Sequence, residues 1–230
     1  MKLCGLQKLT LLDYPGKTAC TVFLGGCNFR CPFCQNGELL SLDTAPAALS
    51  LDTLLAFLKK RRNLLDGVCI TGGEPLLFPD VIDLIREIKT LGYAVKLDTN
   101  GSFPERLRAL AGAGLIDYVA MDIKNSPARY PETAGLSRLD FSKIQESARF
   151  LLAGDLPYEF RTTVVQEFHT SADLMEIGKW LQGAKQYFLQ AFADSEYVLR
   201  PGLHSLSKAE MQGLAAAVRP WIPSTAIRGI

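Results

Sequence analysis

The sequence lacks several features that would place it in well-defined classes of protein. It has no apolar run long enough to span a membrane and no apolar core for a signal peptide after Met1. Its 25 Lys and Arg residues nearly balance 24 Asp and Glu residues, so nothing favours a nucleic-acid or acidic-lipid surface. It also has no low-complexity stretch and no linker rich in Pro, Gly and Ser. We therefore expect a single cytosolic domain over residues 1–230.

Histidine is scarce, which limits the metal sites that can be expected. A structural zinc site normally has four ligands, and neither His169 nor His204 lies at finger-like spacing from the cysteines. A disulfide framework is typical of small secreted domains, whereas this chain has 48% hydrophobic residues and can bury a core without such cross-links. Zinc and disulfides are thus the less favoured interpretations. Cys20 and Cys69 lie in apolar runs and are expected to be small buried residues, and Cys4 has no partner at ligand spacing.

The remaining three cysteines lie close together with the spacing Cys-x3-Cys-x2-Cys. They are Cys27, Cys31 and Cys34, and Phe33 stands directly before the last. Thiolates are the usual ligands of iron–sulfur clusters. Three of them can hold three corners of a four-iron cluster and leave one iron open for a substrate, as a catalytic zinc site leaves one position open. We therefore expect one cluster on this loop.

Short apolar runs alternate with amphipathic helical patterns, which predicts an α/β fold. Strands are predicted at residues 18–24, 68–71, 94–97, 116–121, 159–165 and 187–189. Helices are predicted after Ser50, around 81–88 with Gly92 after the end, at 104–113, 141–153 and 172–181, and after the capping box that begins at Ser207. Six strands that alternate with six helices predict a parallel sheet with right-handed crossovers.

Polar motifs follow the predicted strands. Behind the cysteine loop come Gly72-Gly73-Glu74-Pro75, Asp98-Thr99-Asn100-Gly101 and Asp122-Ile123-Lys124, while Arg161 lies in the fifth strand and Gln190 ends the sixth. In barrels made of such units the active site lies at the C-terminal ends of the strands, so these residues are expected to meet there. Two simpler interpretations stay open: Gly-Gly-Glu as a turn with an exposed acid, and Asp98 as a cap or Asx-turn residue.

The cysteine triplet, the aromatic Phe33 and the later Gly-Gly-Glu motif together resemble the radical S-adenosylmethionine (SAM) superfamily. The resemblance implies an incomplete (β/α)6 barrel of parallel strands, open on one side, with a [4Fe–4S] cluster on the three cysteines and SAM on the open iron. It also implies that Phe33 packs near the adenine. Gly72, Gly73 and Glu74 would contact the amino group of the methionine moiety.

The two aspartate motifs resemble the subfamily of glycyl-radical-enzyme activating enzymes. The resemblance implies that Asp98, Asp122 and the carbonyl of Thr99 surround a monovalent cation and that Lys124 reaches SAM. Further candidates for contact with SAM are Asn100, Arg161 and Gln190, the last of which stands where the formate-lyase activator has a histidine. The segments 11–17 and 34–36 most resemble the activating proteins of anaerobic ribonucleoside-triphosphate reductases.

The expected function is therefore radical initiation. The resemblance implies reductive cleavage of SAM to a 5′-deoxyadenosyl radical, which takes a hydrogen atom from a glycine of a partner glycyl radical enzyme. It also implies a flavodoxin- or ferredoxin-type electron donor. No residue needs to act as a general base, because a hydrogen atom moves rather than a proton. A radical SAM enzyme with a small-molecule substrate is the alternative, and a non-catalytic metal-binding or electron-transfer protein is a more distant one.

Overall fold

The structure is a computed structural model of the whole chain, and it describes residues 1–43, 45 and 49–230. Its contacts divide the chain into two compact units, which we describe in turn. The first unit consists of Met1–Asn28, Glu38–Thr99 and Phe103–Ala120, and the second of Phe29–Gly37, Asn100–Ser102 and Met121–Ile230. The division runs through two predicted motifs, the cysteine loop and Asp98-Thr99-Asn100-Gly101. The single domain expected from the sequence stays a prediction.

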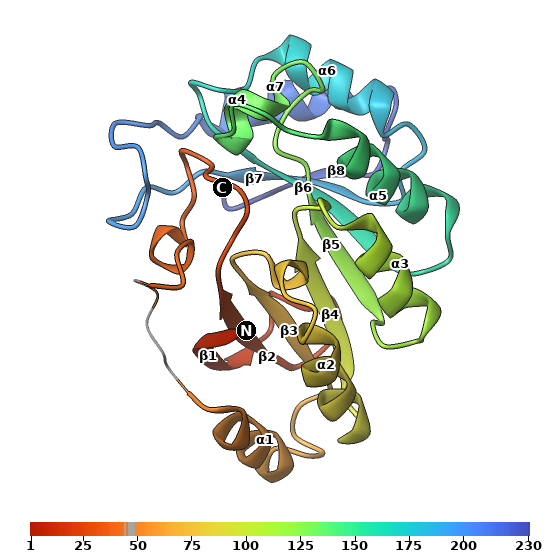
Figure 1. Cartoon of the computed structure of the whole chain (residues 1–230). Helices are drawn as coiled ribbons and strands as arrows, with labels where there is room; N and C mark the ends of the chain where they lie inside the picture. The colour runs from red at the N-terminus through yellow and green to blue at the C-terminus, as the bar shows by residue number, and fades with distance from the viewer. Residues whose placement is uncertain (44, 46–48) are drawn as a thin grey trace. The chain divides into compact units, whose positions relative to one another are not determined.

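The first unit contains a sheet whose strand order follows the chain (Figure 1). Its strands are β1 (Lys2–Thr10), β2 (Ala19–Gly25), β3 (Gly67–Gly72) and β4 (Ala94–Thr99). β1 pairs antiparallel with β2, while β2, β3 and β4 pair in parallel. The helices are α1 (Leu51–Lys60), α2 (Val81–Thr90) and α3 (Pro104–Gly112), and a 3-10 turn, η2 (Pro75–Leu77), follows β3. A second 3-10 turn, η1 (Gly37–Leu39), begins at the unit boundary.

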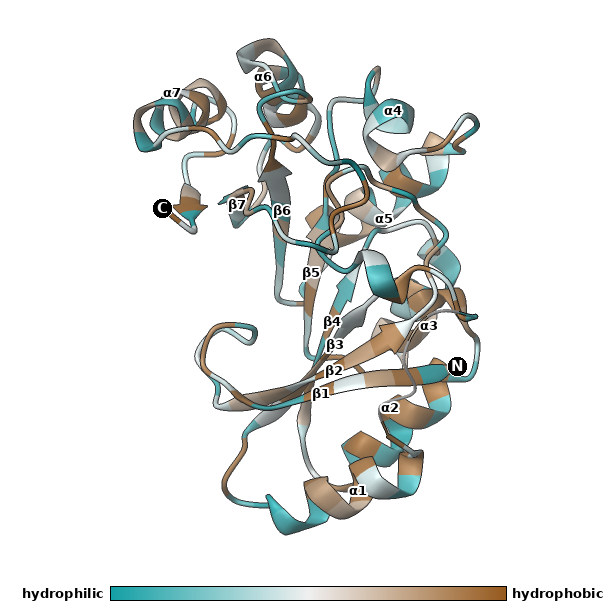
Figure 2. Cartoon of the chain, turned by 90° about the vertical axis from the view of Figure 1, so that its left-hand side faces the viewer, coloured by the Kyte–Doolittle hydropathy of each residue, from teal (hydrophilic) through white to brown (hydrophobic). Residues whose placement is uncertain are grey.

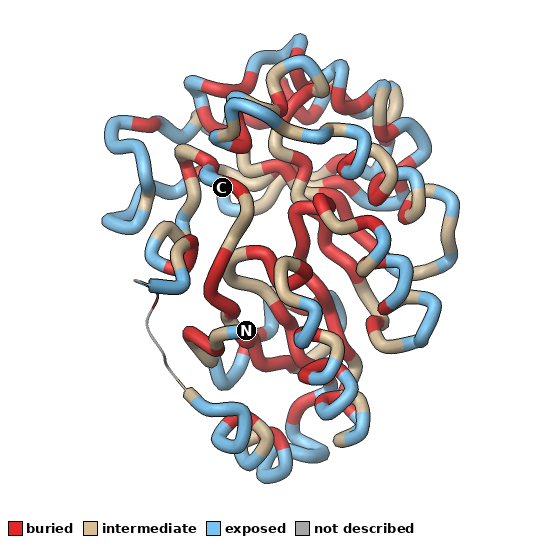
Figure 3. Tube along the Cα trace, viewed as in Figure 1, coloured by how far each residue is buried: buried red, intermediate tan, exposed pale blue. Residues whose placement is uncertain are grey.

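Local signals explain the helices of this unit. Ser50 caps α1, since its side chain accepts the backbone N–H of Thr53. α2 buries residues at helical spacing, namely Val81, Leu84, Ile85 and Ile88. Figure 2 shows that both helices carry a mixture of apolar and polar residues, as expected for helices with one buried face. Figure 3 shows that β2, β3 and β4 are largely buried, so the strands form the core of the unit and the helices cover it.

The second unit contains β6 (Tyr158–Val164), β7 (Tyr187–Ala191) and β8 (Thr225–Arg228), which pair in parallel in that order. β5 (Tyr118–Asp122) crosses the unit boundary, and just after it the backbone N–H of Ile123 donates to the carbonyl of Arg161 in β6 at 2.7 Å. The helices are α4 (Tyr130–Ala134), α5 (Phe141–Ala153), α6 (Ser171–Trp180) and α7 (Lys208–Val218). α6 and α7 pack against each other, and both begin with a capping box.

The α/β class with parallel strands is confirmed, and all six predicted strands and six predicted helices are present. The described residues also contain β1, β8 and the short helix α4, which the sequence analysis did not predict. β4 extends to Thr99, so Asp98 and Thr99 belong to the strand and do not follow it. In the described part of the chain, no helix combines the length and the apolar composition needed to cross a bilayer.

Candidate cofactor-binding site

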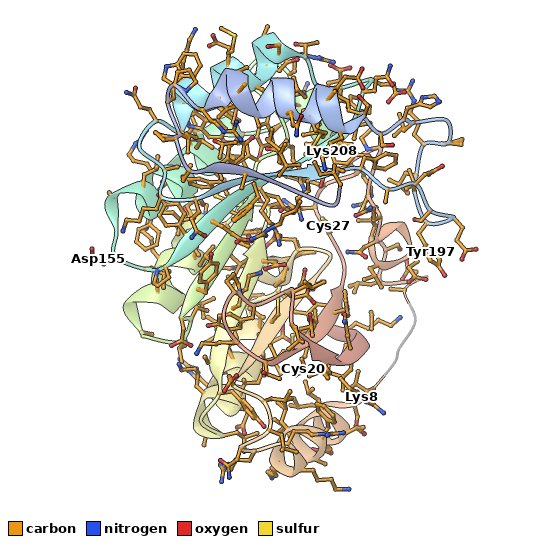
Figure 4. The ribbon with its side chains drawn as sticks, turned by 180° about the vertical axis from the view of Figure 1, so that it is seen from behind. Lys8, Cys20, Cys27, Asp155, Tyr197 and Lys208 are labelled. Carbon is orange, nitrogen blue, oxygen red and sulfur yellow. The ribbon has the colours of Figure 1, made fainter. Side chains whose placement is uncertain are left out.

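The cysteine loop starts in the first unit, directly after β2. Figure 4 labels Cys20 within this strand and Cys27 after its end. Gly26 turns the chain with a φ of 92°, and its N–H donates to the carbonyl of Leu39 at 2.7 Å. The N–H of Cys27 donates to the carbonyl of Leu40 at 3.2 Å. Backbone hydrogen bonds thus fix the chain at the first predicted ligand.

The Gly-Gly-Glu motif packs directly on the start of this loop. Gly73 donates its N–H to the carbonyl of Leu24, and Glu74 donates its N–H to the carbonyl of Gly26, both at 2.8 Å. A Cβ atom at Gly72, which has a φ of 114°, would lie 2.4 Å from the Leu24 oxygen, and one at Gly73 would lie 2.0 Å from the Gly26 oxygen. No side chain fits at either position. The two glycines are required by this close backbone approach, whatever else they contact.

Glu74 is a buried acid, with 1% of its surface exposed. Its Oε1 atom accepts two hydrogen bonds, from the backbone N–H of Leu76 at 3.0 Å and from the Thr99 hydroxyl at 2.8 Å. It thereby caps η2. The alternative of a turn with an exposed acid is therefore wrong. A carboxylate kept out of water at this point is suited to bind a cationic group of a ligand.

Asp98 is held within β4 by an ion pair with Lys96, whose side chain is 1% exposed. The thiol of Cys69 also lies within hydrogen-bond distance, with its Sγ 3.7 Å from Asp98 Oδ1. The ion pair with Lys96 does not test the interpretation of Asp98 as a cap or Asx-turn residue, which stays a prediction. Lys96 was not predicted as part of the site, although a lysine in the apolar run Ala94-Val95-Lys96-Leu97 is an unusual feature that could have marked it.

The second half of the cysteine loop lies in the second unit and forms a turn. The backbone N–H of Cys34 donates to the carbonyl of Cys31 at 3.0 Å, which places the two cysteines at the ends of the turn. Backbone hydrogen bonds to the rest of the unit hold the loop, from Arg30 N–H to the Ala134 carbonyl and from Arg200 N–H to the Pro32 carbonyl, both at 2.9 Å.

Both thiols on this turn lie in a poorly solvated environment. Cys31 is 6% exposed, and burial raises its pKa to about 11; burial also raises the pKa of Cys34. Because an iron–sulfur cluster binds thiolates, the two residues must lose their protons when they bind one. Two thiol donors held on one turn, of which Cys31 is buried and Cys34 partly buried, fit an iron–sulfur cluster well.

Phe33, between these cysteines, is buried with 4% exposure. Its ring centroid lies 5.9 Å from that of Phe168 and 6.2 Å from that of His169. The Nε2 atom of His169 lies 2.9 Å from the carbonyl oxygen of Lys124, so the aromatic group connects the cysteine turn to the end of β5. Phe168 and His169 were not predicted as parts of the site, because nothing in the nearby sequence marks them as neighbours of Phe33.

Asp122 forms the centre of a charge cluster at the end of β5. Its Oδ2 atom lies 3.1 Å from Lys124 Nζ, and its Oδ1 atom lies 2.9 Å from Arg161 Nη2. Burial opposes ionisation of Asp122, but the guanidinium of Arg161 and the ammonium of Lys124 outweigh it and lower the pKa to about 2. Asp122 is therefore a carboxylate at neutral pH, and the charge of Arg161 in an apolar strand is explained by this pair.

Two weaker candidates also lie in the second unit. The Oδ1 atom of Asn100 accepts from the backbone N–H of Ser102 at 3.0 Å and from its hydroxyl at 2.6 Å, so the Asx turn of this motif is at Asn100. Gln190 is aligned with Thr163 of β6 and with Arg228 of β8. Aligned residues of parallel strands share one face of a sheet, so Gln190 lies on the same face as these two residues.

The structure thus divides the predicted site residues between the two units. The first unit contains Cys27, Gly72, Gly73, Glu74, Asp98 and Thr99, and the second contains Cys31, Phe33, Cys34, Asn100, Asp122, Lys124, Arg161 and Gln190. Within the described residues, no three His, Cys, Asp or Glu side chains already form a metal-binding group. The cluster ligands therefore stay a prediction from spacing along the chain.

Comparison with known proteins identifies the family. The model of the Radical SAM superfamily matches residues 21–181. A Methanocaldococcus jannaschii protein, provisionally named a glycyl-radical enzyme activating enzyme, is 30% identical over 98% of this chain and 95% of its own length. The 7-carboxy-7-deazaguanine synthase of Halobacterium salinarum is 38% identical over 40% of this chain and 36% of its own length.

Solved structures show the same fold. SuiB of Streptococcus suis bound to its precursor peptide SuiA matches 91% of this chain and 48% of its own length, with a TM-score of 0.70 and 15% identity. A structure of SuiB bound to S-adenosylmethionine matches with a TM-score of 0.69 and 14% identity. The chain is therefore an enzyme that belongs to the Radical SAM superfamily, whose members use a [4Fe–4S] cluster and SAM.

Proposed function

We propose that this chain is an activating enzyme that generates a glycyl radical on a partner protein. The observation that carries the proposal is the relative from M. jannaschii, since the similarity extends over 98% of the chain and that protein bears the name of an activating enzyme. The aspartate motifs 98–101 and 122–124 support the same subfamily. Anaerobic ribonucleoside-triphosphate reductase is the proposed partner, by the resemblance of segments 11–17 and 34–36.

Cys27, Cys31 and Cys34 would hold the cluster. The fit rests on the donor set, because thiols are the ligands that iron–sulfur clusters take and two of the three are fixed on one turn. When bound, the cluster supplies the single electron that breaks a carbon–sulfur bond of SAM. The burial of Cys31 and Phe33 keeps water from this part of the loop.

The proposed role of the remaining residues is to bind and orient SAM. The Glu74 carboxylate receives the amino group, and Gly72 and Gly73 let the backbone carry Glu74 close to the cysteine loop. Phe33 provides an aromatic surface for the adenine. Lys124 and Arg161 are held by Asp122 and present positive charge to the carboxylate and hydroxyl groups of SAM. None of these residues has to transfer a proton, because the substrate loses a hydrogen atom.

A glycine is the expected site of the radical. A Cα radical is stabilised when the adjacent nitrogen and carbonyl are coplanar with it, and glycine reaches this arrangement most easily because it has no side chain. The partner should present its glycine on a loop that opens locally from its own core. A flavodoxin- or ferredoxin-type protein in the cytosol is the proposed electron donor.

The alternative is a radical SAM enzyme that acts on a small molecule. Partial similarity to 7-carboxy-7-deazaguanine synthases and to a GTP 3′,8-cyclase of Limosilactobacillus fermentum keeps this function as the second candidate. The test compares how much 5′-deoxyadenosine the reduced protein forms from SAM with a genomically neighbouring glycyl radical enzyme and with purine nucleotides. The proposal expects the partner protein to stimulate formation, whereas stimulation by a nucleotide alone would contradict it.

A further inference from the structure

Lys96 is a buried cation in the first unit. Its side chain is 1% exposed and belongs to the middle of β4. Lysine is almost never buried to this extent without a partner of opposite charge, because its ammonium loses its hydration. Residues two apart in a strand point to the same face, so Lys96 shares its face with Asp98. The burial of Lys96 therefore has to be explained by the groups on that face.

Three side chains on this face contact one another, namely Lys96, Asp98 and Cys69. Lys96 Nζ forms an ion pair with Asp98 Oδ1 and lies 3.8 Å from Cys69 Sγ. Cys69 of β3 is aligned with Lys96 of β4, and its Sγ lies 3.7 Å from the same carboxylate oxygen. The ammonium of Lys96 thus neutralises the carboxylate of Asp98 inside the unit. The Oδ1 atom of Asp98 therefore already contacts the Lys96 ammonium and the Cys69 thiol.

This arrangement does not fit the monovalent cation that the subfamily resemblance implies. Such an ion would take its charge compensation from Asp98 and Asp122. Asp98 is already paired with Lys96, and Asp122 is already paired with both Lys124 and Arg161. An added cation at Asp98 would lie close to the Lys96 ammonium, and two like charges at such a distance in a poorly solvated site repel strongly.

We propose that the Lys96 ammonium takes the place of the monovalent cation at Asp98, so that SAM binding by this chain does not depend on monovalent metal ions. The inference rests on the proposed function, since it requires Asp98 to lie at the SAM site. Lys96 is a positioning residue in this account. It fixes the carboxylate of Asp98 and supplies the positive charge that an exchangeable ion would otherwise supply.

The first test measures the dissociation constant of SAM for the reconstituted protein in KCl, NaCl, LiCl and choline chloride at equal ionic strength. The unaltered protein should bind SAM equally in all four, within about twofold. Lys96→Met should weaken binding in choline chloride by on the order of 10–100-fold, and KCl or NH4Cl should restore much of the loss. The matched control is Lys89→Met, which removes a lysine paired with Asp117 in the same unit and should change neither binding nor its response to salt.

The second test needs no cofactor and uses thermal unfolding of the protein without cluster or SAM. Lys96→Met removes the ammonium that pairs with Asp98 Oδ1. The unfolding midpoint of this variant should therefore fall, and it should rise again more in KCl than in choline chloride. Lys96→Met combined with Asp98→Asn removes both charges and should show no such difference. If the single variant is destabilised, the difference between its unfolding midpoints in KCl and choline chloride can still be compared with that of the double variant.

Several outcomes separate the inference from the proposed function. If SAM binding by the unaltered protein falls by about tenfold or more when choline replaces potassium, an exchangeable ion is present and the inference is wrong. The inference is equally wrong if Lys96→Met binds SAM as the unaltered protein does. If the unaltered protein binds no SAM in any salt, the proposed function fails, and the unfolding midpoints then decide whether Lys96 acts as the built-in cation of Asp98.

Discussion

Replacement of Glu74 by glutamine separates the structural role of this residue from its proposed role in binding SAM. The hydrogen bonds that Glu74 accepts from the Leu76 N–H and the Thr99 hydroxyl both end on one atom, Oε1. An amide oxygen can accept both in the same way. We therefore expect Glu74→Gln to change the free energy of unfolding by no more than about 1 kcal/mol.

The effect on SAM should be much larger. A hydrogen bond between a carboxylate and an ammonium contributes about 1.5–3 kcal/mol, and an amide cannot replace its charge. This corresponds to roughly a 10- to 150-fold increase in the dissociation constant. Isothermal titration of the anaerobic, reconstituted protein with SAM measures the constant, while thermal unfolding measures the stability of the same samples.

The matched control is Glu159→Gln in β6. Glu159 is equally buried at 1% exposure, but its carboxylate pairs with Arg228 and has no proposed contact with SAM. This variant should lose more stability than Glu74→Gln, because it leaves Arg228 without its charged partner, and it should bind SAM within about twofold of the unaltered protein. Unchanged SAM affinity in Glu74→Gln would refute the assignment and leave Glu74 as a cap of η2.

Three further predictions concern the cluster and the charges around it. Alanine at Cys27, Cys31 or Cys34 should remove the absorbance of the cluster and all cleavage of SAM, whereas Cys4→Ser should keep both; loss of the cluster in Cys4→Ser would show that the ligands are misassigned. Gly135→Ala should lower cluster content and stability, because its Cβ would lie 1.9 Å from the Arg30 carbonyl oxygen next to the cysteine turn. Gly114→Ala has a similar φ of 65° with no atom within 4 Å, so it should cost only the backbone strain of about 1–2 kcal/mol, and equal effects of the two substitutions would contradict this account. Asp122→Asn should keep the cluster but weaken SAM binding by on the order of 10–100-fold, since Lys124 and Arg161 lose the group that orients them; the same affinity as in the unaltered protein would show that this charge cluster is structural only.

The sequence predicted those elements that carry their own local signals. Ser50 and Ser207 cap their helices as expected, because a cap depends on residues within a few positions of it. β1 was missed because it is an antiparallel strand with mixed exposure, and β8 because four residues carry too little pattern. Asp98 was placed after its strand, since a single carboxylate gives no sign that a lysine two residues earlier will pair with it inside the sheet.

The candidate site shows the same division between local and distant information. The spacing of the cysteines and the Gly-Gly-Glu motif could be recognised because each lies in one short segment. The contact of Phe33 with Phe168 and His169 could not, since it depends on how the chain returns after β6. The reason for Gly73 was likewise only visible in the structure, where its Cβ would meet the backbone of Gly26.

Electron paramagnetic resonance can detect the glycyl radical that this chain is proposed to make on another protein. The reduced, cluster-loaded chain is incubated anaerobically with SAM and the genomically neighbouring glycyl radical enzyme, prepared with ordinary glycine and with glycine deuterated at Cα. We expect a doublet signal with ordinary glycine that collapses with the deuterated one, and no signal when the Cys31→Ala variant is used. Absence of the doublet, in samples where the chain still cleaves SAM and a small metabolite accelerates that cleavage, would contradict the proposed function.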